Sequence, residues 1–193
     1  MIGLTRVRSF KPIADGKAEI LILGSMPGRA SLAARQYYAH PRNAFWPIAS
    51  ALLGFERSSP YAKRVRALKA ARIALWDVLQ SCTREGSLDA RIEDGIANDL
   101  NRFFRTHRKI RRVFFNGAKA EAAFRRCVLP TLRGNSLSYR RLPSTSPANA
   151  SLSRARKLRA WRAILASHPG PAPGVGDRNT GPGRLSDCLK EVS

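Results

Sequence analysis

Hydrophobic residues along this chain fall into two kinds of pattern. Short apolar runs of strand length alternate with longer stretches in which apolar residues recur every three or four positions. The first run, AEILIL, is aliphatic and followed by a glycine, which is typical of a strand buried in a sheet. The predicted strands are 18–23, 73–79, 111–116 and 138–143.

The longer stretches predict amphipathic helices. One begins with Ser59 as its cap and Pro60 in its first turn, and another places Ile96, Leu100 and Phe103 on one face. In the last predicted helix, the arginines face outward. The residues predicted to face the core are Leu152, Ala155, Leu158, Trp161 and Leu165. The predicted helices are 44–55, 58–72, 93–107, 118–129 and 151–166.

The alternation of strands and helices predicts an α/β fold, a three-layer α/β/α sandwich around a central four-stranded parallel sheet. The length of 193 residues suits one domain, which we expect to span 1–167. The Gly/Pro-rich residues 168–193 are predicted to form a flexible tail. Ligands in such folds bind beyond the carboxyl ends of the strands. The loops that follow three of the strands should therefore meet there, namely 24–43, 116–117 and 143–150.

The excess of basic residues indicates what kind of partner the chain binds. The sequence holds 35 Lys and Arg against 13 Asp and Glu, a formal net charge of +22. Residues 20–55 and 122–176 contain no acidic side chain at all. Such stretches suit a phosphate backbone, so we expect a nucleic acid partner rather than a membrane.

Several common classes of site are excluded by the motifs. The three cysteines form no CxxC pair, and the three histidines are too scattered for a metal, so no metal or other cofactor is expected. The glycines match neither a P-loop nor a dinucleotide fingerprint, and no nucleophile elbow is present. Without a signal-like start or a membrane-length apolar run, the sequence predicts a cytoplasmic protein.

Two loops carry the candidate chemistry. In GSMPGRASLAARQYYAHPRNAFW, Pro27 restricts the turn and Gly28 permits close approach of another chain. The aromatic residues Tyr37, Tyr38, Phe45 and Trp46 offer a stacking surface for a base, or the two tyrosines only pack the loop. In LPSTSPANA, hydroxyl and amide groups lie between prolines, an arrangement suited to holding phosphate.

Four segments in order resemble the uracil-DNA glycosylase superfamily. They are LILGSMPGRASL, YYAHPRNAFW, LWDVLQSCTREGSLDARI and LPSTSPANA, and the similarity extends over residues 18–166. The resemblance is strongest to the hypoxanthine-DNA (deoxyinosine) glycosylase branch, which carries GSMPG, YY, NxFW and STSPAN. It implies a monofunctional DNA glycosylase with the uracil-DNA glycosylase-like fold. Such an enzyme excises uracil, hypoxanthine or both from single- or double-stranded DNA and leaves an abasic site for base-excision repair.

The resemblance also implies a monomer that works in the cytoplasm, at the nucleoid, without a cofactor. One departure leaves alternatives open. Met26 stands where the wider superfamily has an Asn or Asp that positions the hydrolytic water. A non-catalytic protein that binds damaged bases or abasic sites is therefore an alternative, and a basic RNA-processing or phosphate-binding module is another.

Residue roles follow from the matched motifs. Asn43 is the candidate catalytic residue, orienting the water or the leaving base, although it could only cap the next helix. Phe45 is expected to stack on the flipped base, and Asn116 to read its edge or merely to end its strand. Asp77 is either a general base or a structural hydrogen-bond acceptor. The remaining substrate-binding candidates are Gly24, Ser25, Met26 and Pro27 around the base, Ser144, Thr145 and Ser146 at the phosphate or sugar, and Ala148 or Asn149 as the wedge.

Overall fold

The computed structural model describes residues 5–84, 92–132 and 136–166. The predicted tail at 168–193 and part of the LWDVLQSCTREGSLDARI motif lie outside these residues. The central sheet has the order β3-β2-β6-β7 and every neighbouring pair is parallel, as predicted. Its strands are β2 (Ile20–Gly24), β3 (Ile73–Asp77), β6 (Arg112–Asn116) and β7 (Ser138–Leu142).

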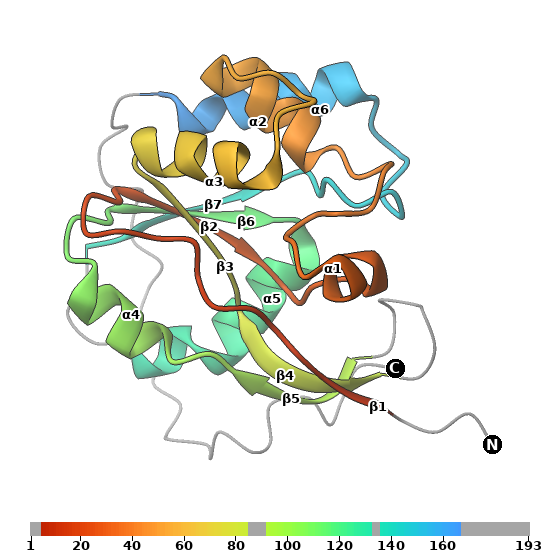
Figure 1. The fold of residues 1–193 in the computed structure, drawn as a ribbon. Helices are drawn as coiled ribbons and strands as arrows, with labels where there is room; N and C mark the ends of the chain where they lie inside the picture. The colour runs from red at the N-terminus through yellow and green to blue at the C-terminus, as the bar shows by residue number, and fades with distance from the viewer. Residues whose placement is uncertain (1–4, 85–91, 133–135, 167–193) are drawn as a thin grey trace.

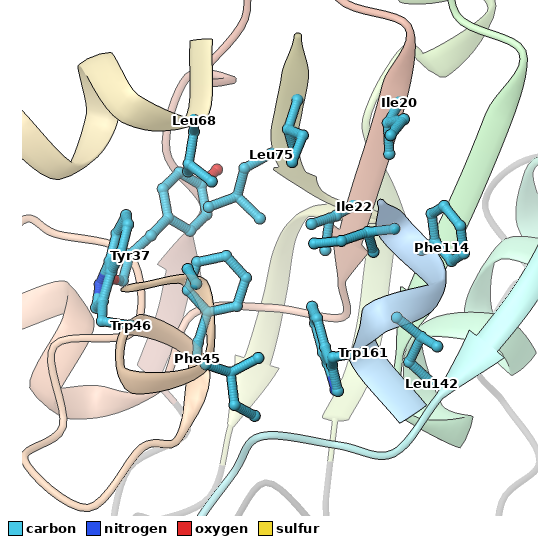
Figure 2. Packing of buried hydrophobic residues seen from close by; sticks show 14 of the residues in the cluster. Ile20, Ile22, Tyr37, Phe45, Trp46, Leu68, Leu75, Phe114, Leu142 and Trp161 are labelled. Atoms are coloured by element: carbon cyan, nitrogen blue, oxygen red, sulfur yellow. The ribbon is translucent and has the colours of Figure 1, made fainter. Parts of the chain in front are cut away.

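Helices cover both faces of this sheet (Figure 1). Alternate strand residues point to opposite faces, so Ile22 and Phe114 contribute to one core while Leu23 and Phe115 contribute to the other. The first core lies under α2 (Phe45–Leu53), α3 (Tyr61–Ala70) and α6 (Arg154–Trp161), as Figure 2 shows. The second lies under α4 (Leu100–Thr106) and α5 (Ala118–Cys127), while the short α1 (Arg29–Ala34) belongs to the loop after β2. The three-layer prediction is confirmed.

A second, antiparallel sheet was not predicted. It has the order β1-β4-β5. Its strands are β1 (Thr5–Arg8), β4 (Leu79–Arg84) and β5 (Ile92–Ala97). The predicted strand 73–79 is therefore divided between two sheets, and the predicted helix 93–107 is wrong over its first half. The helical part starts at Leu100, where the side chain of Asp99 accepts a hydrogen bond from the main-chain N–H of Arg102 at 2.8 Å. Antiparallel pairing with β4, the preceding strand, decided the conformation of β5.

Two further details of the helix predictions are wrong. Ser59 does not cap α3, since the residue before that helix is Pro60 and the buried Ser59 hydroxyl has no hydrogen-bond partner in the described structure. In the predicted helix 151–166, Ala155 and Leu165 were expected to face inward, but Ala155 is exposed and Leu165 is 51% exposed, while Lys157 lies inside at 5% exposure. The helix passes into a 3₁₀ turn (Arg162–Ile164) after Trp161, and this turn changes the direction of the residues that follow.

Candidate active site

Three loops meet at the carboxyl edge of the parallel sheet. The main-chain N–H of Ala44, just before α2, donates to the carbonyl of Thr145 at 3.0 Å. The Asn116 side chain, at the end of β6, holds Thr145 twice, accepting from its N–H and donating to its hydroxyl, each at 2.8 Å. The predicted convergence of these loops is confirmed. Through its two hydrogen bonds to Thr145, the Asn116 side chain fixes the loop after β7 to the end of β6.

The segment after β2 presents unused hydrogen-bond donors. Gly24 and Ser25 accept main-chain hydrogen bonds from Val78 and Leu79 at 2.8 and 3.1 Å. In contrast, the N–H groups of Ser25 and Met26 donate to nothing among the described residues. The buried Met26 side chain packs against residues of the antiparallel sheet, so only its main chain faces the site. These two N–H groups can therefore bind a ligand oxygen.

Gly24 is required at this point because two side chains crowd it. A Cβ atom placed on Gly24 would lie 2.4 Å from the Asp77 Oδ1 atom and 3.2 Å from the Tyr38 hydroxyl oxygen. Asp77 itself is 2% exposed and accepts a hydrogen bond from the Ser9 hydroxyl at 2.7 Å. Its main-chain carbonyl accepts another from Asn98 at 2.9 Å. These contacts support the structural interpretation of Asp77, whose carboxylate ties the first residues of the chain to the sheet edge.

The expected stacking residue, Phe45, is enclosed. It is 1% exposed and packs edge-to-face with Trp46 and Trp161 (Figure 2). The distances between ring centroids are 5.0 and 5.7 Å. Tyr38 stacks on it at 4.2 Å with an interplanar angle of 27°. A base cannot reach the face of Phe45 that Tyr38 covers. As a residue, Tyr38 is only partly buried, whereas Phe45 is enclosed. The sequence names Tyr38 among the possible stacking residues without favouring it.

The main chain around Tyr38 explains how this ring is placed. Its φ of 55° is in the left-handed region, which costs a non-glycine residue roughly 1–2 kcal/mol. Anchors on both sides impose this conformation, since the Tyr37 carbonyl accepts from the Trp46 indole at 2.7 Å and the Ala39 N–H donates to the Ser31 hydroxyl at 3.2 Å. Adjacent aromatic residues in a loop do not reveal which of them turns outward, so no pattern in the sequence distinguishes Tyr38.

The hydroxyl of Tyr38 is buried and makes no hydrogen bond to a described residue. Burial is the main cause that raises the pKa of Tyr38 above its usual value of 10.0, and the charge of Asp77 adds to it. The neighbouring Asn116 amide acts in the opposite direction. Tyr38 is therefore a neutral phenol at physiological pH, with an unused donor beside Asp77.

Asn43 lies at the start of α2. Its Oδ1 atom accepts a hydrogen bond from the main-chain N–H of Phe45 at 2.9 Å, and its own N–H donates to the His40 carbonyl at 2.8 Å. The capping alternative is thus supported, although the N-cap position itself belongs to Ala44. The same bond orients the amide so that its NH₂ group, unpaired among the described residues, is available to a substrate.

The loop after β7 is closed on itself. Asn149 donates from its main chain to the Ser146 carbonyl at 3.0 Å and from its side chain to the Ser144 carbonyl at 3.4 Å. Thr145 is 1% exposed, so its side chain does not reach a phosphate in this structure and instead anchors the loop to Asn116. Ser144 and Ser146 are half-buried, and Ala148 is exposed at the apex. Of the two wedge candidates, only Ala148 projects, because the side chain of Asn149 is engaged within the loop.

A hollow of about 340 Å³ lies beside this loop, at the start of α5. Ser144 and Asn149 line it together with Arg141, Gly117 and Ala118. Gly117 has a φ of 97°, and a Cβ there would lie 2.7 Å from the Cβ of Ser144, so only glycine permits this close packing. In the described parts of the chain, no group of three His, Cys, Asp or Glu residues is placed to hold a metal ion.

Comparison with known proteins identifies the family. Residues 10–166 match the model of the Uracil DNA glycosylase superfamily. The chain belongs to this superfamily. Two relatives carry the name Hypoxanthine DNA glycosylase: one from Methanosarcina acetivorans, 38% identical over 82% of this chain and 97% of its own, and one from Methanosarcina barkeri, 36% identical over 78% and 92%. A solution NMR structure from M. acetivorans, named provisionally as a uracil DNA glycosylase, has a TM-score of 0.70 and 35% identity, covering 84% of this chain and all of its own.

Proposed function

We propose that this protein is a monofunctional DNA glycosylase that flips a deaminated base, hypoxanthine or uracil, out of DNA and hydrolyses its N-glycosidic bond. The product is an abasic site, the first intermediate of base-excision repair. The names of the two Methanosarcina relatives support this proposal. The observation that carries it is the gathering of a half-buried aromatic ring, two unused main-chain donors and an oriented amide at one sheet edge, since these are groups that a flipped base requires.

The flipped base is recognised by stacking and by main-chain donors. In this proposal the base stacks on Tyr38, and Phe45 supports that ring from behind at 4.2 Å. Stacking of a base on an aromatic side chain is worth about 1–3 kcal/mol. The N–H groups of Ser25 and Met26 donate to the carbonyl oxygen that uracil and hypoxanthine share. This lactam oxygen is the group that deamination creates, so the donors favour the deaminated base over its parent.

Bond cleavage then relies on electrostatic stabilisation more than on a strong base. The glycosidic bond breaks early, so positive charge develops on the sugar and negative charge on the departing base. The Asn43 amide, fixed by its bond to the Phe45 N–H, donates to the leaving base or orients the water. That water supplies the hydroxyl at C1′ of the abasic sugar, and its proton passes to the base. A donor placed where charge develops contributes about 3 kcal/mol to such a step.

DNA is held outside the pocket by phosphate contacts and by the loop after β7. Ser144 and Ser146 offer hydroxyls at the site edge, and the exposed apex at Ala148 enters the space that the flipped base leaves. The outer side of α6 adds positive charge with its exposed arginines Arg154, Arg156 and Arg159. We expect a monomer that acts on chromosomal DNA. In the described structure, no helix has the length and apolar character needed to cross a membrane.

One assay separates this function from its alternatives. The protein is incubated with labelled oligonucleotides that contain a single deoxyinosine or deoxyuridine, and alkali then cleaves any abasic site. Strand scission supports the glycosylase. A gel shift without scission would instead favour a damaged-base binding protein, the alternative that Met26 at the usual Asn or Asp position keeps open. The absence of both scission and a gel shift would contradict the proposed function.

A further inference from the structure

Helix α6 holds the loop after β7 at both of its ends. The Trp161 indole donates to the Pro143 carbonyl at 2.9 Å, and the Lys157 ammonium donates to the Asn149 carbonyl at 2.7 Å. The two donors are four residues apart and therefore lie on the same face of the helix, one turn from each other. The loop is thus attached to α6 by one neutral and one charged hydrogen bond.

Burying the Lys157 ammonium group on the inner side of α6 costs free energy. Lys157 is 5% exposed, whereas its neighbours Arg154, Arg156 and Arg159 are on the outer side of the helix. Burial lowers the pKa of Lys157, because removing an ammonium group from water disfavours its charged form. An apolar residue of similar length would avoid this penalty. The lysine instead makes a charge-assisted hydrogen bond to the loop, which is stronger than the bond that a neutral donor would make.

The carbonyl that Lys157 holds belongs to the residue on which the loop closes. Besides its two bonds to Ser144 and Ser146, Asn149 accepts a hydrogen bond from the Ser151 hydroxyl at 2.9 Å. Ala148, the exposed apex, is the residue immediately before it. Ala148 has no hydrogen bond to α6; its N–H donates to the Ser146 hydroxyl at 3.3 Å, so its position is fixed by this bond together with Asn149, the residue that Lys157 holds.

We propose that Lys157 is a positioning residue for duplex DNA: by fixing Asn149, it holds Ala148 where the apex fills the gap that the flipped base leaves in the stack. This inference rests on the proposed function. Flipping a base out of a duplex costs a few kcal/mol of pairing and stacking, which the inserted apex offsets. Single-stranded DNA has no pairing to break, so its excision does not need the apex at a defined height.

The test compares excision of hypoxanthine from double- and single-stranded oligonucleotides under single-turnover conditions. Lys157→Met keeps the length of the side chain and removes the donor. We expect its excision rate on duplex DNA to fall about tenfold, with the rate on single strands within about twofold of the unchanged protein. Lys157→Arg retains a charged donor and should recover part of the duplex rate.

Arg156→Met is the matched control, because it removes one charge from the exposed side of the same helix. It should weaken binding to both substrates alike and reduce the slope of log affinity against log salt by about one. Equal losses on single and double strands with Lys157→Met, or no loss on either, would overturn the role of Lys157. If Lys157→Met unfolds, Lys157→Gln takes its place, because it removes the charge and keeps a shorter polar side chain; a duplex-selective loss would support the inference and an equal loss would overturn it. Absence of excision by the unchanged protein would contradict the proposed function itself.

Discussion

The two loops that form the site differ in how their polar groups are satisfied. In the loop after β2, the N–H groups of Ser25 and Met26, the Tyr38 hydroxyl and the Asn43 NH₂ group have no partner among the described residues. In the loop after β7, Thr145 and Asn149 are bonded through both main chain and side chain. Among these groups the Tyr38 hydroxyl is buried, and an unsatisfied buried polar group is costly and is retained where a ligand completes it. The contrast supports our proposal that the first loop binds a base and the second presents an ordered apex to DNA.

Among the substitutions that test this contrast, Asn43→Ala is expected to have the largest effect on excision. The substitution removes the amide that we propose faces the substrate, so we expect the single-turnover excision rate to fall about 100- to 1,000-fold. Loss of the bond to the Phe45 N–H should also lower the free energy of unfolding by about 1 kcal/mol. Urea denaturation separates the two effects. Full turnover in a stably folded Asn43→Ala protein would contradict the catalytic role.

A second test distinguishes the ring of Tyr38 from its hydroxyl. Tyr38→Ala should lower excision about 10- to 100-fold, since a stacking surface worth about 1–3 kcal/mol is lost. Tyr38→Phe keeps the ring and removes only a hydroxyl that has no partner among the described residues, so its rate should stay within about twofold. Base affinity, measured by titration with free hypoxanthine, should follow the same order. A loss with Phe as large as with Ala would show that the hydroxyl contacts the substrate.

In the second loop, Thr145→Val should act on stability. It leaves the Asn116 NH₂ group without the acceptor that now lies at 2.8 Å, at a cost of about 1–3 kcal/mol in the free energy of unfolding. Excision by the folded protein should fall by less than about tenfold. A protein of unchanged stability that has lost excision would instead assign Thr145 the substrate contact that its motif predicts.

The smallest expected effect is on stability at high pH. The pKa of Tyr38 is raised by burial and by Asp77, while an unfolded tyrosine titrates near 10. The contribution of this phenol is therefore fully present below pH 10 and is lost as the pH rises above 10 toward its folded pKa. Tyr38→Phe should make the decline in unfolding free energy between pH 9 and pH 11 shallower, by at most about 1.4 kcal/mol per pH unit. Identical slopes for the two proteins would argue against a buried, neutral phenol.

Sequence reasoning predicted the parallel sheet and the meeting of its loops because both follow from local signals. Short apolar runs such as residues 18–23 indicate strands. Loops that leave parallel strands at the same edge of a sheet lie close together. The same reasoning failed for β5, where Ile92–Ala97 follows a helical spacing yet pairs with β4. No pattern in the sequence indicated that Lys157, a charged residue, lies inside, where it donates to a carbonyl of the loop after β7.

The sequence by itself determined the fold class, the superfamily and the edge of the sheet where the candidate site lies, because periodicity and short motifs are local properties of the chain. Only the tertiary structure decided which groups occupy that edge. Phe45 and Tyr38 are equally good stacking residues by composition, but packing against Trp46 and Trp161 encloses one and leaves the other at the surface. Burial and hydrogen-bond partners depend on residues far apart in the chain, so no local pattern can assign them.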